Sequence, residues 1–246
     1  MQKIFVSAVG FILTVGISAN AAEIKLLSAN GVTLILDELA PSFERATNNK
    51  LTIGYDEAGV IRRQILNGED FDVTILPAGW DEIRAKIAGN PIGIAHADLG
   101  IGVLATAPKP DTSSTDALKR ALLAAKSIVY TDPKTGGIAG VLFARMIEKL
   151  GISDEVNKKS KQVANVLNAR FLVNGDADLV VQLSSQILAV PGVQFVPLPP
   201  DFQARITFSG AIAAGAKDAE TAKSLLQFLT APGAAAVIRA KGFEPG

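Results

Sequence analysis

Cysteine is absent from this chain of 246 residues, and histidine and tryptophan each occur only once. Without cysteine the chain has no disulfide, no thiolate nucleophile and no zinc site built on cysteine. A serine or cysteine triad needs a histidine between its nucleophile and an orienting group. The single histidine, His96, stands at the start of an apolar run over 99–105, where we expect a boundary residue. The composition therefore predicts neither a catalytic triad nor a metal site.

An excess of charge of either sign is also lacking, because 24 basic residues balance 24 acidic ones. No basic patch favours nucleic acid as a partner, and no long run of charge indicates a disordered tail. The glycine loop near residue 136 lacks the Gly-Lys-Ser/Thr sequence of a nucleotide-binding P-loop. We expect a protein that binds no nucleic acid and uses no cofactor.

The N-terminal segment has the organisation of a secretory signal peptide. Lys3 supplies a positive charge, residues 4–17 are almost wholly apolar, and Ala19-Asn20-Ala21 provides the small residues of a cleavage site. The apolar run is too short to span a bilayer comfortably, for which about 20 residues are needed. We therefore predict a signal peptide over 1–21 and a mature protein in the periplasm.

Strand and helix patterns alternate along the rest of the chain, which is typical of an α/β fold with a mostly parallel sheet. The expected strands cover 23–29, 51–55, 71–76, 127–130, 177–182, 193–198 and 205–213. The expected helices cover 32–47, 60–66, 81–88, 115–125, 137–150, 184–189, 219–229 and 233–241, and a strand edge with a helix covers 163–173.

The C-terminal part has too few elements for a core of its own. A second α/β unit begins after the proline-rich turn 107–111. After that unit, only one strand and two helices remain. We expect the chain to return to its first unit. This predicts lobe 1 from residues 22–104 plus 208–246 and lobe 2 from 105–207, joined by crossing strands near 103–106 and 204–209. A cleft between two such lobes is a preferred ligand site.

The segment from Tyr130 to Gly151 has the features of a binding loop. An apolar strand runs through Thr131-Asp132-Pro133-Lys134-Thr135-Gly136-Gly137 into a helix that opens on small residues. A helix N-terminus presents unpaired N–H groups and a partial positive charge, and the glycines leave room for a ligand to approach the backbone. The loop predicts a small-ligand site.

Several segments, taken together, resemble the periplasmic solute-binding proteins of ABC transporters. They cover residues 28–32, 131–151, 230–235 and 241–245, and the likeness is strongest to the molybdate-binding subfamily. The resemblance implies an α/β, two-lobed periplasmic binding protein of type II. Each lobe would hold a mixed, mostly parallel sheet flanked by helices, with two hinge strands between the lobes. It also implies a monomer that captures a small solute by hinge closure and delivers it to a membrane permease.

The resemblance also assigns positions to the binding site. The two serines of molybdate binders correspond to Gly31, after Asn30, and to the helix start at Glu57-Ala58-Gly59. Backbone N–H groups of the glycine loop and of a position near Ala164 would complete the site, and the tyrosine of the subfamily corresponds to Gln182. The implied ligand-binding residues are Asn30, Gly31, Ala58, Gly59, Thr135, Gly136, Gly137, Asn165 and Gln182.

Three hydroxyl groups of that pattern are missing here. Each lost hydrogen bond to a tetrahedral oxyanion costs about 1–3 kcal/mol unless another donor replaces it. Asp56 and Glu57 would repel an anion if their side chains face inward. These departures favour a small organic anion or another organic solute over molybdate or tungstate. A ligand sensor and a periplasmic enzyme with Asp56, Glu57 or Asp132 as acid or base remain alternatives.

Overall fold

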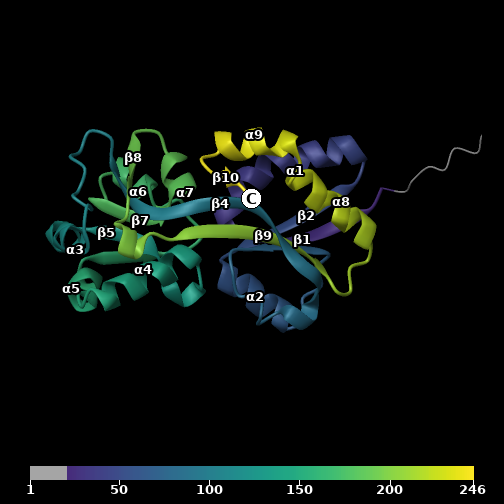
Figure 1. Ribbon diagram of the computed structural model, residues 1–246, viewed down its shortest axis with the longest axis horizontal. Helices are drawn as coiled ribbons and strands as arrows, with labels where there is room; N and C mark the ends of the chain where they lie inside the picture. The colour runs from purple at the N-terminus through teal and green to yellow at the C-terminus, as the bar shows by residue number, and fades with distance from the viewer. Residues whose placement is uncertain (1–20) are drawn as a thin grey trace, which may run out of the picture.

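The computed structural model describes residues 21–246, so nearly all of the predicted signal peptide lies outside the described residues. The described chain forms two lobes, and the long strands β4 (Ile87–Leu104) and β9 (Arg205–Ala213) lie where they meet (Figure 1). Within residues 21–246, no helix is both long enough and apolar enough to cross a bilayer. The two-lobed α/β fold expected from the sequence is therefore confirmed.

The first lobe consists of the N-terminal and C-terminal parts of the chain. Its strands besides β9 and the first part of β4 are β1 (Glu23–Ala29), β2 (Lys50–Asp56), β3 (Val73–Leu76) and β10 (Glu244–Pro245). Its helices are α1 (Thr33–Thr47), α2 (Ala58–Leu66), α8 (Ala219–Leu229) and α9 (Pro232–Ala240), with the 3-10 turns η1 (Asn30–Val32) and η2 (Arg84–Lys86).

The second lobe is made from the middle of the chain. Its strands besides the end of β4 are β5 (Ile128–Thr131), β6 (Ser160–Val163), β7 (Leu179–Leu183) and β8 (Val193–Pro197). Its helices are α3 (Thr115–Ala124), α4 (Ile138–Lys149), α5 (Ser153–Lys158), α6 (Arg170–Val173) and α7 (Ser184–Leu188), with the 3-10 turns η3 (Pro133–Thr135) and η4 (Pro200–Phe202).

One strand path, β2-β1-β3-β9-β4-β7-β5-β6, runs through both lobes. The pairs β1–β2, β1–β3, β5–β6 and β5–β7 are parallel, whereas β9 is antiparallel to both β3 and β4. Along β4 the partner changes: Asp98 pairs with Arg205 of β9, and Leu99 pairs with Leu183 of β7. We use lobe 1 for residues before Leu99 and from Arg205 onward. The division predicted at 104/105 and 207/208 stays a prediction.

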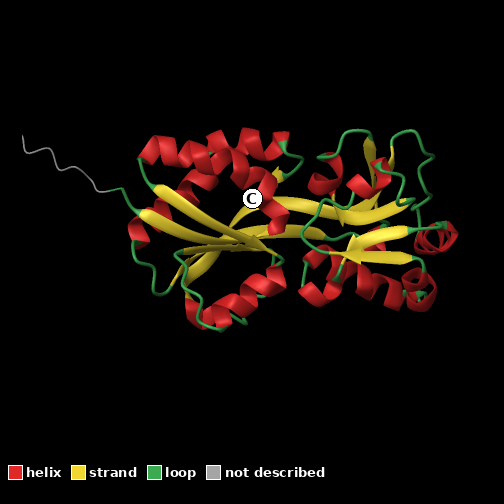
Figure 2. Cartoon of the chain, turned by 180° about the vertical axis from the view of Figure 1, so that it is seen from behind, coloured by secondary structure: helices red, strands yellow, loops and turns green. Residues whose placement is uncertain are grey.

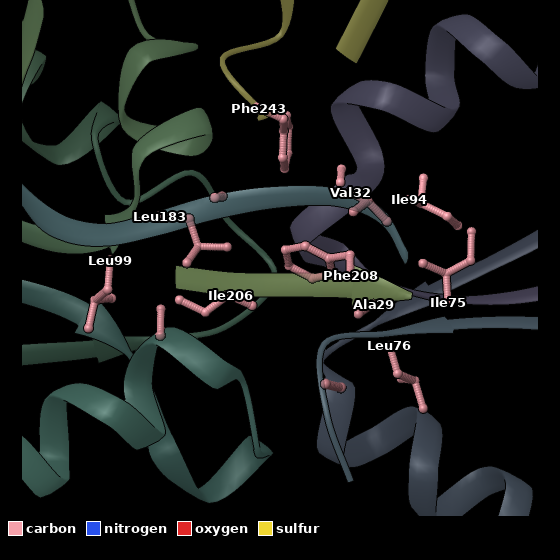
Figure 3. Close-up of a cluster of buried hydrophobic side chains, with 14 of the residues drawn as sticks. Ala29, Val32, Ile75, Leu76, Ile94, Leu99, Leu183, Ile206, Phe208 and Phe243 are labelled. Carbon is pink, nitrogen blue, oxygen red and sulfur yellow. The ribbon is translucent and has the colours of Figure 1, made fainter. Parts of the chain in front are cut away.

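Helices cover both faces of the sheet in each lobe (Figure 2). Helix α1 illustrates how a helix is held against the sheet, because its apolar residues recur at helical spacing and are buried. These residues are Ile35, Leu36, Leu39 and Phe43. Phe208 of β9 is fully buried where the lobes meet, with Leu183 on one side and Ala29 and Val32 on the other (Figure 3). The apolar core thus continues from one lobe into the other.

The helix predicted over 81–88 is wrong. The chain makes turns after Trp80, then the short η2, and β4 already begins at Ile87. Ile83 and Ile87 have the spacing of a helix face, but Ile83 is buried from a turn and Ile87 pairs with Ala213 of β9. The partner strand lies far along the sequence, so its pairing overrides the local pattern.

Candidate ligand-binding cleft

A cavity of about 410 Å³ lies between the lobes and is lined from both. In open α/β sheets, ligands bind beyond the carboxyl ends of the parallel strands. Strands from both lobes end at this cavity, namely β1 at Ala29, β2 beside Glu57, β3 beside Pro77, β5 at Thr131 and β7 at Leu183. The parallel strands of the two lobes therefore point their carboxyl ends toward the same space.

Three helices, α1, α2 and α4, begin at the wall of this cavity. None of the three has a side chain that caps its first N–H groups. Elsewhere, α3 and α8 are capped by Ser114 and Asp218, whereas α5, α6, α7 and α9 also lack such a cap. At α2 most of the first N–H groups have acceptors within the protein, and the N–H of Ala58 has none among the described residues. The positive end of a helix dipole and any unpaired N–H groups attract negative charge. The cavity is therefore suited to an anionic group of a ligand.

Charged side chains are few in the lining, which holds Asp37, Glu57 and Arg170. Asp37 and Arg170 are exposed to solvent, whereas Glu57 is half-buried. The hydroxyl of Tyr55 donates to Asp37 Oδ1 at 3.2 Å, and burial together with the Asp37 charge raises the pKa of Tyr55. Among the described residues, no group of His, Asp or Glu side chains could hold a metal ion. The charged groups of the lining are thus two carboxyl groups and one guanidinium group.

Glu57 immediately precedes α2, yet its side chain does not cap that helix. It reaches toward lobe 2 instead, where its Oε1 accepts the backbone N–H of Asn165 at 3.3 Å. Burial raises the pKa of the Glu57 carboxyl and the charge of Asp56 adds to the rise, while hydrogen bonds from Asn165 and Asn30 oppose it. Glu57 is thus a partly desolvated carboxyl group shared between the ligand cavity and the lobe contact.

The two lobes touch beside the cavity through backbone and amide groups. Asn30 Nδ2 donates to Asn165 Oδ1 at 2.5 Å, and the N–H of Gly59 donates to the carbonyl of Gly136 at 3.2 Å. A Cβ atom added to Gly59 would lie 2.7 Å from Gly136 Cα, and one added to Gly136 would lie 2.6 Å from Gly59 Cα. Only glycine permits this approach, so the structure has the lobes closed on each other.

The sequence family described as bacterial extracellular solute-binding protein matches residues 24–244, nearly the whole described chain. This protein belongs to that family. Its fold is the type II periplasmic binding fold, and its sequence is similar to the molybdate-binding subfamily, as the resemblance implied. Solute-binding proteins of this family bind small ligands and work with a permease.

Two relatives and one solved structure illustrate the range of the family. The aconitate isomerase of a Pseudomonas species is 31% identical over 89% of this chain and 87% of its own. The molybdate-binding protein ModA of Azotobacter vinelandii is 25% identical over 92% and 91%. The solved periplasmic molybdate-binding protein of Azotobacter vinelandii has a TM-score of 0.72 and 19% identity, covering 91% of this chain and 99% of that one, and shares the fold.

The predicted site residues of this solute-binding protein fall into two groups. Five of them line the cavity, namely Asn30, Gly31, Ala58, Asn165 and Gln182. The other four lie at the lobe contact beside it or next to that contact, namely Gly59, Thr135, Gly136 and Gly137. The N–H of Gly59 is already used by Gly136. Contact of either group with a ligand stays a prediction.

Gln182 supports the loop of lobe 2 that faces the cavity. Its Oε1 accepts the N–H of Asn168 at 3.0 Å, and its Nε2 donates to the carbonyl of Val166 at 3.2 Å. The side chain is buried, and both of its functional ends are engaged. Gln182 therefore holds the loop at Val166 and Asn168, directly after Asn165, which has a left-handed φ of 57°.

Gly31 occupies a position where no side chain fits. A Cβ atom added there would lie 2.2 Å from the ring of Phe208, which is fully buried. The serine expected at this position in molybdate binders is thus incompatible with the packing of Phe208. The absent hydroxyl is a consequence of the core and not a free space for a ligand group.

Sequence reasoning missed three lining side chains that carry polar or packing roles. Asp37 and Tyr55 lie on α1 and β2, and Arg170 begins the one-turn helix α6. Asp37 lies one turn after Thr33, the first residue of α1. This spacing puts it on the same side of the helix as the helix start, so the sequence could have indicated a place near the cleft. Arg170 had no comparable signal, because its position depends on the irregular loop from 164 to 169.

Proposed function

We propose that this protein captures a small organic carboxylate in its interlobe cleft, outside the cytoplasmic membrane, and delivers it to the permease of an ABC importer. The observation that carries the proposal is the set of three uncapped helix N-termini, α1, α2 and α4, which open on one cavity. Separate N-termini suit a ligand with several carboxylate groups, each bound by backbone N–H groups.

The dimensions and the lining favour an organic ligand over a tetrahedral oxyanion. A cavity of about 410 Å³ lies within the roughly 300–1,000 Å³ of small-molecule pockets. Phe208 excludes a hydroxyl at position 31, and the amide of Gln182 is engaged with its own loop. The relative with 31% identity is named for aconitate, a tricarboxylate, which supports the same ligand class.

A ligand panel tests the proposal. Thermal shift and calorimetry would compare trans-aconitate, cis-aconitate, citrate, molybdate and sulfate. A ligand at 100 times its Kd stabilises the folded state by about 2.7 kcal/mol, which raises the Tm by roughly 5–10 °C in a protein of this size. We expect that shift with a carboxylate and none with molybdate. A shift with molybdate alone would contradict the proposal.

Arg170 provides a sharper version of this test. Among the described residues it is the one cationic side chain that lines the cavity, and it is exposed. Arg170→Gln should weaken carboxylate binding several-fold, because it removes an attractive charge worth up to about 1 kcal/mol when exposed to solvent. Arg145→Gln on α4 is a matched control, because Arg145 is exposed and does not line this cavity.

A second candidate is an isomerase that acts on a carboxylate in the same cleft. The half-buried Glu57 in the lining and the relative named aconitate isomerase favour it. Glu57 would take a proton from one carbon of an allylic system and return it to another, with no further reactant. Proton NMR of trans-aconitate in D₂O would detect exchange or the cis isomer, and Glu57→Gln should abolish both. Tight binding of trans-aconitate without proton exchange would contradict the isomerase and support the binding function.

A further inference from the structure

We propose that the protein takes up one proton at Glu57 when it captures an anionic ligand, so that ligand and proton are enclosed together. The inference rests on the proposed function, because it concerns how the same cleft accommodates a carboxylate. It assigns Glu57 as a residue that determines ligand charge. It also distinguishes the two candidate functions, because a protonated Glu57 cannot take a proton from carbon.

The position of Glu57 is the first step. Its side chain lines the cavity beside the N-terminus of α2, where the N–H groups of Gly59 and Val60 already have backbone acceptors and the N–H of Ala58 has none among the described residues. Lobe 2 encloses the carboxyl from the other side. Oε1 accepts the N–H of Asn165, and Oε2 lies only 2.4 Å from the place where a Cβ atom of Gly137 would stand. An anion bound at α2 in the closed structure is therefore a close neighbour of this carboxyl group.

The surrounding charges are the second step. Asp56, on the strand before α2, uses its Oδ1 to accept the N–H of Glu57 at 2.7 Å. Asp37 of α1 and Arg170 of α6 line the same cavity but are exposed, so solvent and salt screen them. The groups of lobe 2 that directly face Glu57, Asn165 and Gly137, are uncharged. Among the described residues, no lysine, arginine or histidine side chain forms an ion pair with Glu57.

The chemistry follows from these contacts. Two carboxylates that share a desolvated site do not both stay ionised, and one retains a proton. The ligand brings its own negative charge into the cavity, so protonation of Glu57 relieves the repulsion. The resulting O–H can donate a short, charge-assisted hydrogen bond to the ligand carboxylate. Burial of Glu57, which already raises its pKa before the ligand arrives, acts in the same direction.

Proton uptake has a measurable consequence for affinity. Between the pKa of Glu57 in the free protein and its higher pKa in the complex, each unit of falling pH strengthens binding by up to about tenfold. The ligand's own carboxylates titrate as well. The informative quantity is therefore the difference between the protein and a variant that lacks the titrating group, measured with the same ligand.

The experiment is calorimetry of trans-aconitate at pH 7 in two buffers with different enthalpies of protonation. The difference in observed heat gives the number of protons taken up. We expect wild type to take up close to one proton more than Glu57→Gln, which keeps a hydrogen-bonding side chain without the charge. Asp37→Asn is the matched control, because Asp37 is the other carboxylate among the described residues that line the cavity. We expect this variant to keep the wild-type uptake.

The outcomes separate the inference from the function on which it rests. Equal proton uptake in wild type and Glu57→Gln, with trans-aconitate bound by both, overturns the inference and leaves carboxylate capture intact. Loss of uptake in Asp37→Asn but not in Glu57→Gln also overturns it, because the proton then resides on Asp37. If neither trans-aconitate nor citrate binds to wild type at any pH, the proposed function fails and the inference fails with it.

Discussion

The approach of Gly59 to Gly136 makes the closed state sensitive to a single methyl group. In Gly59→Ala the new Cβ would lie 2.7 Å from both Gly136 Cα and the Thr135 carbonyl oxygen, which are backbone atoms and cannot rotate away. Ordinary carbon contacts need about 3.5–4.0 Å, so the lobes must separate by roughly 1 Å at this point. The N–H of Gly59, now 3.2 Å from the Gly136 carbonyl, then leaves hydrogen-bonding range.

The magnitude follows from the contacts that such a separation breaks. The bond from Gly59 and the bond from Asn165 to Glu57 are each worth about 0.5–1.5 kcal/mol. Their joint loss of roughly 1–3 kcal/mol weakens ligand affinity by about 5- to 150-fold. Folding should not suffer, because alanine is favoured over glycine in a helix by up to about 1 kcal/mol.

The assay combines calorimetry with trans-aconitate and small-angle X-ray scattering. Gly59→Ala should bind more weakly and keep a larger radius of gyration with ligand, while its Tm without ligand stays at or above that of wild type. Gly233→Ala is a matched control, because Gly233 is also the second residue of a nine-residue helix and has open space around it. Wild-type affinity and compaction in Gly59→Ala would refute the reasoning.

Three further predictions concern stability. Gly31→Ser drives a side chain into the Phe208 ring and should cost about 1–3 kcal/mol by overpacking, measured by urea unfolding; wild-type stability would contradict the packing argument. Burial raises the pKa of Glu57, so the folded state binds this proton more readily than the unfolded state. The ionised carboxyl therefore lowers the free energy of unfolding at neutral pH, and this penalty fades as the pH falls through the raised pKa toward 4.5. Glu57→Gln should therefore have a higher Tm than wild type at pH 7, with the difference shrinking toward pH 4; a constant difference would count against it. Asp72→Ala leaves the backbone N–H groups of Lys25 and Lys217 without their acceptor, so it should lower the free energy of unfolding by about 2–4 kcal/mol. Chemical denaturation measures this loss, and a loss below about 1 kcal/mol would contradict the prediction.

Most elements were predictable because their signals are local. The strand β9 and the helix α8 have the predicted bounds, since alternating apolar residues and an Asp218 cap mark them in the sequence. The segment after Trp80 was not predictable, because its strand state depends on pairing with β9. The local sequence pattern predicts an element correctly where the buried residues follow the helix or strand period. It fails where pairing with a strand distant in sequence determines the conformation.

The candidate site was predictable only at its strand and helix ends. Asn30 and Ala58 lie at the starts of η1 and α2 and line the cavity. Asn165 also lines the cavity, but it lies in the loop after β6, and only the family resemblance indicated it. The reason that position 31 carries no side chain was not accessible, since Phe208 is remote in sequence. Likewise the amide of Gln182 had the composition of a ligand donor, and only its contacts with Val166 and Asn168 reveal a supporting role.

The place of β9 in the sheet has a consequence for the order in which the lobes fold. β9 lies between β3 and β4, although it is synthesised long after both. Lobe 1 therefore has two open strand edges until the chain has been made through Ala213, whereas the strands of lobe 2 are all present by Pro197. Pairings between such distant segments form slowly. We expect pulse-labelled hydrogen exchange to protect the amides of β5 and β7 before those of β3, and simultaneous protection would contradict this order.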